Sequence, residues 1–170
     1  LPTHLMAQTE ERTAADSTAT CRYTFDPARQ TEAHLQRTWE CPHDAYGDSD
    51  YCCFHMSRDE RASNDVSSEE IVERIKTNLK SGDVRDNEYV GADLPHLSLT
   101  YQDINGGSNH VLNFQYADIE GLDITHGRLE QGLNLRGATV GALKFEGATL
   151  GGTLDAEGLS VESVFSAYET

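Results

Sequence analysis

The sequence predicts a mainly β protein whose chain winds as a coil of short repeats, and three observations support this. Bulky apolar residues recur at every fifth position from about residue 92 to residue 154. The residue two positions before each of them is almost always apolar or small. A period of five matches neither the 3.6 residues of an α-helix nor the two of an ordinary strand. We therefore expect each unit to be a short strand and a turn, with four units making one square coil.

The first column of the repeat contains the bulky residues. It comprises Leu94, Leu99, Ile104, Phe114, Ile119, Ile124 and Leu129, and after a one-residue slip Leu135, Val140, Phe145 and Leu150. With five residues on each side of the coil, residues twenty apart would stack at about the 4.8 Å spacing of paired strands. The sequence thus predicts contacts of Leu94 with Phe114, and of Ile104 with Ile124. Residues 106–109 interrupt the apolar residues without changing the count, which indicates a loosened corner or a bulge.

The second column lies two residues before the first. It comprises Ala92, Leu97, Gln102, Gly107, Leu112, Ala117, Leu122, Gly127, Leu133, Ala138, Leu143 and Ala148. Only Gln102 in this column is large and polar. Large and small residues alternate from Leu112 onward, which predicts that opposite faces of each coil are alike.

Two units, residues 92–96 (ADLPH) and 117–121 (ADIEG), resemble the A(D/N)LXX unit of the pentapeptide-repeat family. The resemblance covers about half of the chain and is more specific in its period than in its letters. Membership of this family implies a right-handed quadrilateral β-helix. An ordinary β-sandwich is the alternative, but it would require nearly every residue of the second column to be apolar by chance.

The 170 residues suggest two small modules joined by a helix. Residues 1–20 are polar and predict a flexible arm. Residues 21–56 contain all four cysteines and form a candidate metal module. Residues 57–87 form a linker and a capping helix, and residues 88–170 form the repeat coil.

The cysteine-rich segment predicts a structural zinc site with Cys21, Cys41, Cys52 and His55 as ligands. Zinc in structural sites takes four nitrogen and sulfur ligands in a tetrahedron, and a C-x2-H pair supplies two of them from one tight turn. A module of about 35 residues is too small to fold on its apolar core alone, so the metal would supply the missing free energy.

Two disulfides are an alternative use of the four cysteines in an extracellular setting. Because Cys52 and Cys53 are adjacent, pairing them with each other would strain the backbone, so both would need Cys21 and Cys41 as partners. Buried thiols without a metal are the remaining structural alternative.

Within the zinc interpretation, Cys53 could replace Cys52, and His43 could compete with His55. We favour Cys52 with His55 because their spacing matches a zinc knuckle. A catalytic zinc is a further alternative. The combination of this segment with the repeats is similar to uncharacterised pentapeptide-repeat proteins of halophilic archaea.

The sequence also predicts one helix, from Ser68 to Ser81. Ser67 and Glu70 have the spacing of a capping box, and Gly82 is a stop signal. Apolar residues lie along one face of the helix, which we expect to cover the open edge of the first coil. A helix that binds a partner is the alternative.

The composition is strongly acidic, with 29 acidic against 13 basic residues and a formal charge of −16. Dense carboxylates keep a protein soluble in high salt, so we suspect a halophilic source. The charge argues against direct binding to nucleic-acid phosphates, which requires clustered lysine and arginine. An acidic coil could instead mimic DNA and inhibit a type II topoisomerase, as some pentapeptide-repeat proteins do.

The sequence contains none of the usual enzyme motifs, such as a glycine-rich phosphate loop or G-x-S-x-G, so we expect a non-enzymatic protein. The favoured function is a rigid acidic scaffold that binds another protein or further copies of itself. A DNA mimic and the soluble domain of a larger membrane channel or sensor are the alternatives. Since no apolar run is long enough to span a bilayer, we expect a cytoplasmic protein.

Overall fold

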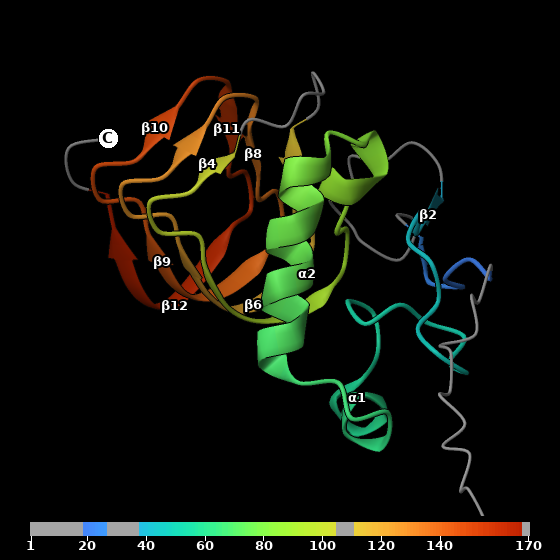
Figure 1. The fold of residues 1–170 in the computed structure, drawn as a ribbon. Helices are drawn as coiled ribbons and strands as arrows, with labels where there is room; N and C mark the ends of the chain where they lie inside the picture. The colour runs from blue at the N-terminus through green and yellow to red at the C-terminus, as the bar shows by residue number, and fades with distance from the viewer. Residues whose placement is uncertain (1–18, 27–37, 105–110, 168–170) are drawn as a thin grey trace, which may run out of the picture.

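The computed structural model describes residues 19–26, 38–104 and 111–167 of the chain. In this part of the chain, parallel strands stack into a β-solenoid of about three coils, preceded by two helices and a small module (Figure 1). The mainly β fold and the coil predicted from the five-residue period are therefore confirmed. Most of the polar arm predicted for residues 1–20 lies outside the described residues, as do residues 106–109.

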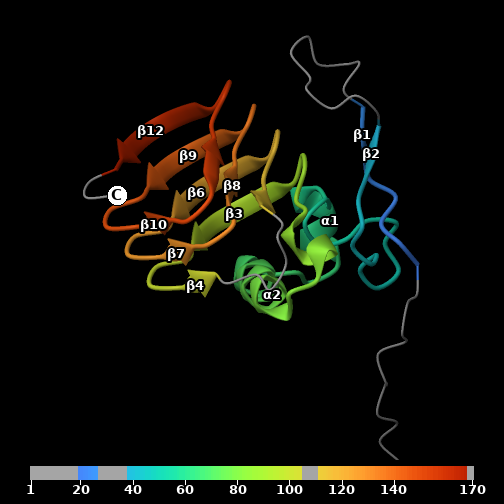
Figure 2. The ribbon, with the colours of Figure 1, turned by 90° about the horizontal axis from the view of Figure 1, so that it is seen from above.

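Three parallel sheets run along the solenoid. The first contains β3 (Asp93–Ser98), β6 (Asp118–Asp123), β9 (Thr139–Lys144) and β12 (Ser160–Ser166). The second contains β4 (Asp103–Ile104), β7 (Arg128–Leu129) and β10 (Thr149–Leu150), and the third β5 (Leu112–Asn113), β8 (Gly132–Asn134) and β11 (Thr153–Asp155). Figure 2 shows the long strands of the first sheet side by side. The four predicted sides form three sheets, because two successive units share each long strand.

The predicted stacking of residues twenty apart is wrong. Leu94 pairs with Ile119, which is 25 residues further along the chain, and Ile119 pairs with Val140, which is 21 further along. Each later coil contains 21 residues, which is one more than four units of five. The extra residue lies at the bend between the second and third sheets. The first coil contains four more residues in the same place, since Ile104 and Leu112 are eight positions apart, whereas Leu129 and Leu133 are four apart.

The small residues of the second column from Leu112 onward follow left-handed turns. Four residues with left-handed backbone conformations, at φ between 53° and 64°, each precede a small member of the column. These residues are Tyr116 before Ala117, His126 before Gly127, Gly137 before Ala138, and Gly147 before Ala148. Left-handed turns also precede the larger residues Gln102 and Leu159, at Tyr101 (φ 56°) and Gly158 (φ 68°), so the turn by itself does not require a small side chain. Whether opposite faces of each coil are alike stays a prediction.

The apolar columns form the core. Leu94, Leu97 and Leu99 of the first coil are fully buried, and so are their equivalents Ile119, Leu122 and Ile124 in the second coil. Burying one such side chain contributes about 2 kcal/mol relative to exposing it. The repeated burial of equivalent side chains in successive coils therefore stabilises the coil as a whole.

The predicted helix is α2 (Ser68–Ser81), with its bounds as expected. The Ser67 hydroxyl accepts a hydrogen bond from the Glu70 backbone, and Gly82 ends the helix in a left-handed conformation at φ 74°. A capping box would also have the Glu70 carboxylate accept a hydrogen bond from the Ser67 backbone amide. This part of the prediction is wrong, because the carboxylate accepts hydrogen bonds from Tyr46 and Arg74 instead. The helix packs against β3 and lies beside the first coil (Figure 2), as predicted.

The linker before α2 contains a helix that the sequence analysis missed, α1 (Arg58–Ser63). Ser57 and Glu60 form a complete capping box at its start. A short 3-10 helix, η2 (Val84–Asn87), follows α2. In the N-terminal module, β1 (Thr24–Phe25) and β2 (Trp39–Glu40) form a small antiparallel pair.

Candidate metal centre

The structure brings Cys21, Cys41, Cys52 and His55 together. One potential ligand atom from each of them lies within 4.8 Å of the other three. Cys21 precedes β1 and Cys41 directly follows β2, while Cys52 and His55 come from one turn in which the Cys52 carbonyl accepts the His55 amide at 3.0 Å. All four residues are buried, with exposed fractions between 2 and 9%.

The distances suit a tetrahedral metal ion. The sulfur atoms of Cys41 and Cys52 are 3.8 Å apart, and the Cys52 sulfur is 3.2 Å from Nδ1 of His55. Two thiolates at the usual zinc–sulfur distance of about 2.3 Å would themselves be about 3.8 Å apart in a tetrahedron. All four cysteines of the chain are free in this structure, so the disulfide alternative is not supported.

The second nitrogen of His55 is also held in place. Its Nε2–H donates a hydrogen bond to the carbonyl of Val90 at 2.9 Å, which leaves Nδ1 with a lone pair beside the Cys52 sulfur. Such a partner on the outer nitrogen is typical of metal-binding histidines. The Tyr23 ring stacks on the imidazole at 4.0 Å with an angle of 13° between the planes, which fixes the plane of the ring.

The pKa values of the three thiols depend on one another. Hydrogen bonds from Cys41 and Cys52 lower the pKa of the Cys21 thiol. The hydrogen bond with Cys21 raises the pKa of Cys41 to about 12, and hydrogen bonds with Cys21 and Cys41 also raise the pKa of Cys52 well above its ordinary value. One negative charge thus opposes the formation of others, whereas a divalent ion would stabilise all three thiolates together.

The two competing residues lie outside this group of four. His43 donates from Nε2 to the carbonyl of Glu88 at 2.7 Å and stacks on the Tyr89 ring. Cys53 is buried, and burial raises the pKa of its thiol to about 11. Both therefore have a packing role beside the centre.

Arg61 is a residue of the centre's surroundings that the sequence analysis missed. It is 9% exposed, and its guanidinium donates hydrogen bonds to the carbonyls of Cys53 at 3.1 Å, Phe54 at 3.4 Å and Asp93. It thereby joins the turn that carries Cys52 and His55 to the first strand of the solenoid. The capping box at Ser57 could have revealed the helix that carries Arg61, but no local signal indicates its acceptors.

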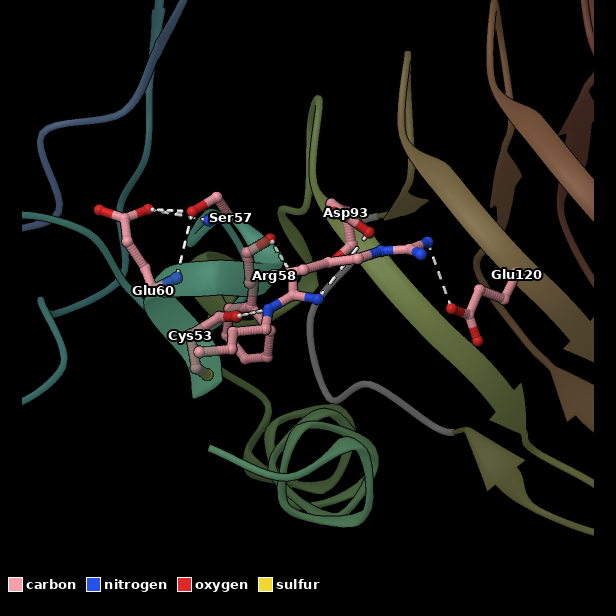
Figure 3. Close-up of polar contacts among 8 residues, drawn as sticks. Cys53, Ser57, Arg58, Glu60, Asp93 and Glu120 are labelled. Carbon is pink, nitrogen blue, oxygen red and sulfur yellow. Dashed lines mark hydrogen bonds and ion pairs between the residues drawn. The ribbon is translucent and has the colours of Figure 1, made fainter. Parts of the chain in front are cut away.

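Figure 3 shows the surroundings of this contact, with Ser57 and Glu60 capping α1 and Asp93 at the start of β3. Arg58, three residues before Arg61, instead extends along the surface to the carboxylate of Glu120 at 3.4 Å. The two arginines of α1 thus differ. Arg61 is buried, donates to backbone carbonyls and lies 3.8 Å from the Asp93 carboxylate, whereas Arg58 forms an exposed ion pair with Glu120.

Comparison of the chain with protein-family models, with curated proteins and with solved structures gives no match. No helix among the described residues is both long and apolar enough to cross a membrane. The fold and the cluster of four residues therefore define the protein as a β-solenoid with a candidate metal centre, and its function is inferred from these features.

Proposed function

We propose that this chain is a non-enzymatic interaction protein of the pentapeptide-repeat type, in which a structural zinc ion fixes the N-terminal module to a rigid β-solenoid. The observation that carries the proposal is the closed set of four buried donors, one of which, His55, also hydrogen-bonds Val90 at the start of the first coil. Zinc would hold the module folded and docked at the same time.

Four protein ligands favour a structural metal over a catalytic one. A catalytic zinc keeps one position open for water or substrate, whereas Cys21, Cys41, Cys52 and His55 would fill all four positions of a tetrahedron. A structural zinc ion would stabilise the module, since its only regular structure within the described residues is a pair of two-residue strands. Metal binding would supply folding free energy that this small core lacks.

The surface of the solenoid supports an acidic scaffold. Three of its basic residues pair with acidic neighbours: Arg128 with Glu130, Arg136 with Asp155, and Lys144 with Asp123. These are all the lysines and arginines of residues 88–170, so an excess of carboxylates remains on the solenoid, with Asp103, Asp118, Glu146 and Glu162 exposed to solvent or to a basic protein partner. A cytoplasm of high salt, as in halophiles, is the setting that this composition suits.

Native mass spectrometry tests the zinc centre directly. We expect one zinc ion per chain, lost on chelation together with near-ultraviolet circular dichroism from Trp39 and Tyr23, which pack near and against His55. Cys52→Ser should abolish zinc binding, whereas Cys53→Ser, a matched change at the neighbouring position, should retain it. A metal-free chain with the same spectrum and stability would contradict the proposal.

The DNA-mimic and membrane-domain hypotheses stay predictions. Supercoiling by a type II topoisomerase tests the first of them. Inhibition by a stoichiometric amount of this chain would support mimicry, and unchanged supercoiling at a large excess would reject it.

A further inference from the structure

The candidate metal centre places two cysteine sulfur atoms close enough to react with each other. Sγ of Cys41 and Sγ of Cys52 are 3.8 Å apart, and neither residue forms a disulfide in this structure. Rotation of the two side chains would close this gap to about 2.0 Å, the length of a disulfide bond. The third sulfur, that of Cys21, is held by a hydrogen bond from the backbone amide of Cys52 at 3.2 Å. The geometry therefore favours Cys41 and Cys52 as the pair that oxidation would join.

A cavity of about 210 Å³ lies beside this pair. Cys52 and Cys53 line it together with residues of α2 and η2. Two of these residues, Arg74 and Arg85, have side chains that are 49% and 65% exposed, so the cavity opens to solvent. Hydrogen peroxide is about the size of two water molecules, each of which takes up about 30 Å³ in the liquid. A small oxidant therefore fits in the cavity next to Cys52, although Cys52 itself is only 2% exposed.

We propose that hydrogen peroxide oxidises Cys41 and Cys52 to a disulfide, which releases the zinc ion and loosens the N-terminal module from the solenoid. The inference rests on the proposed zinc centre and assigns a means of regulation to it. A metal-bound cysteine is a thiolate, which is also the form that reacts with oxidants. The centre would therefore hold both sulfur atoms in their reactive form.

The reaction balances in two steps. The Cys52 thiolate first attacks one peroxide oxygen, so that the O–O bond breaks and a sulfenic acid and a hydroxide ion form. The Cys41 thiolate then attacks the Cys52 sulfur, the S–S bond forms, and a second hydroxide ion leaves. Two electrons pass from the two sulfur atoms to the peroxide, and zinc leaves as Zn²⁺.

The disulfide would remove two of the four ligands. Cys21 and His55 alone do not make a closed structural zinc site. Cys21 precedes β1 and His55 donates to the carbonyl of Val90 at the start of the first coil, so both segments lose the metal that would join them. A disulfide between residues 11 positions apart restrains the chain less than an ion held by four ligands. All four cysteines lie in the module, so the solenoid itself should be unchanged.

Stepwise addition of hydrogen peroxide to the reduced, zinc-loaded 170-residue chain tests the proposal, with a colorimetric chelator that reports free zinc. We expect each disulfide to consume one peroxide molecule and to release one zinc ion. Peptide mapping by mass spectrometry should identify the bond as Cys41–Cys52. Trp39, the single tryptophan of the chain, lies two residues before Cys41, and its fluorescence should shift to longer wavelength. Dithiothreitol with added zinc should reverse both changes.

The matched control is Cys53→Ser, because Cys53 lines the same cavity but lies outside the group of four potential ligands. This variant should release zinc and form the same disulfide at the same peroxide concentration as the parent chain. Zinc that stays bound at a large excess of peroxide overturns the proposal, and so does a disulfide that includes Cys21 or Cys53 in place of the expected pair. A reduced chain that binds no zinc contradicts the proposed zinc centre instead. The peptide map and the Trp39 fluorescence then still decide whether Cys41 and Cys52 form the switch.

Discussion

The Arg61 side chain joins the turn that carries Cys52 and His55 to the start of β3 through three backbone carbonyls. Among the described residues it is the only side chain seen to do so, and Arg61→Ala removes it. Its guanidinium donates to the carbonyls of Cys53, Phe54 and Asp93. A hydrogen bond contributes about 1 kcal/mol net, and a buried acceptor left without its partner costs about 1–3 kcal/mol. The three contacts together predict a loss of about 3 kcal/mol in the free energy of unfolding.

Urea denaturation of the zinc-loaded chain, followed by far-ultraviolet circular dichroism, measures this loss. For a protein of this size, 3 kcal/mol corresponds to a fall of roughly 6–12 °C in melting temperature. Arg58→Ala is the matched control, because it removes the same side chain from the same helix. Its ion pair with Glu120 joins side chains that are 73% and 55% exposed, so its loss should cost less than about 1 kcal/mol. If the two variants lose the same free energy, Arg61 does not join the module to the solenoid as we argue.

Two further predictions concern the core. Leu122→Ala should lower the free energy of unfolding by about 3 kcal/mol, because this side chain is fully buried between coils. The control Val111→Ala, at an exposed position, should lower it little, and urea denaturation compares the two variants. Burial raises the pKa of Tyr89, so its contribution to stability is complete below pH 10 and is lost as the pH rises further. In Tyr89→Phe, which loses the bonds to Asp86 and Asn78, the urea midpoint should therefore fall less between pH 9 and pH 11 than in the parent chain, and an equal fall would contradict the assignment.

The candidate ligands could be found from the sequence, but their surroundings could not. A C-x2-H pair and two further cysteines identify Cys21, Cys41, Cys52 and His55, because the turn geometry of a zinc knuckle is local. The acceptor of His55 is the carbonyl of Val90, 35 residues away. Every residue offers such a carbonyl, so no pattern of residue types distinguishes the one that is used.

The repeat illustrates the same limit in the fold. The five-residue period determined which side chains point inward, because direction alternates locally along a strand. It did not determine that coils contain 25 or 21 residues. The first coil contains five residues more than a coil of twenty would. Because five residues are one full period, this insertion leaves the five-residue pattern of the sequence unchanged.

The sequence by itself determined the class of fold, the bounds of α2 and the four residues that gather as a candidate metal centre. These features depend on caps, turns and spacings within a few neighbouring residues. Only the tertiary structure decided the stacking register and the bridging role of Arg61. Those features depend on hydrogen bonds and packing between segments that are distant in sequence, and their free energies exist only once the coils have closed on one another.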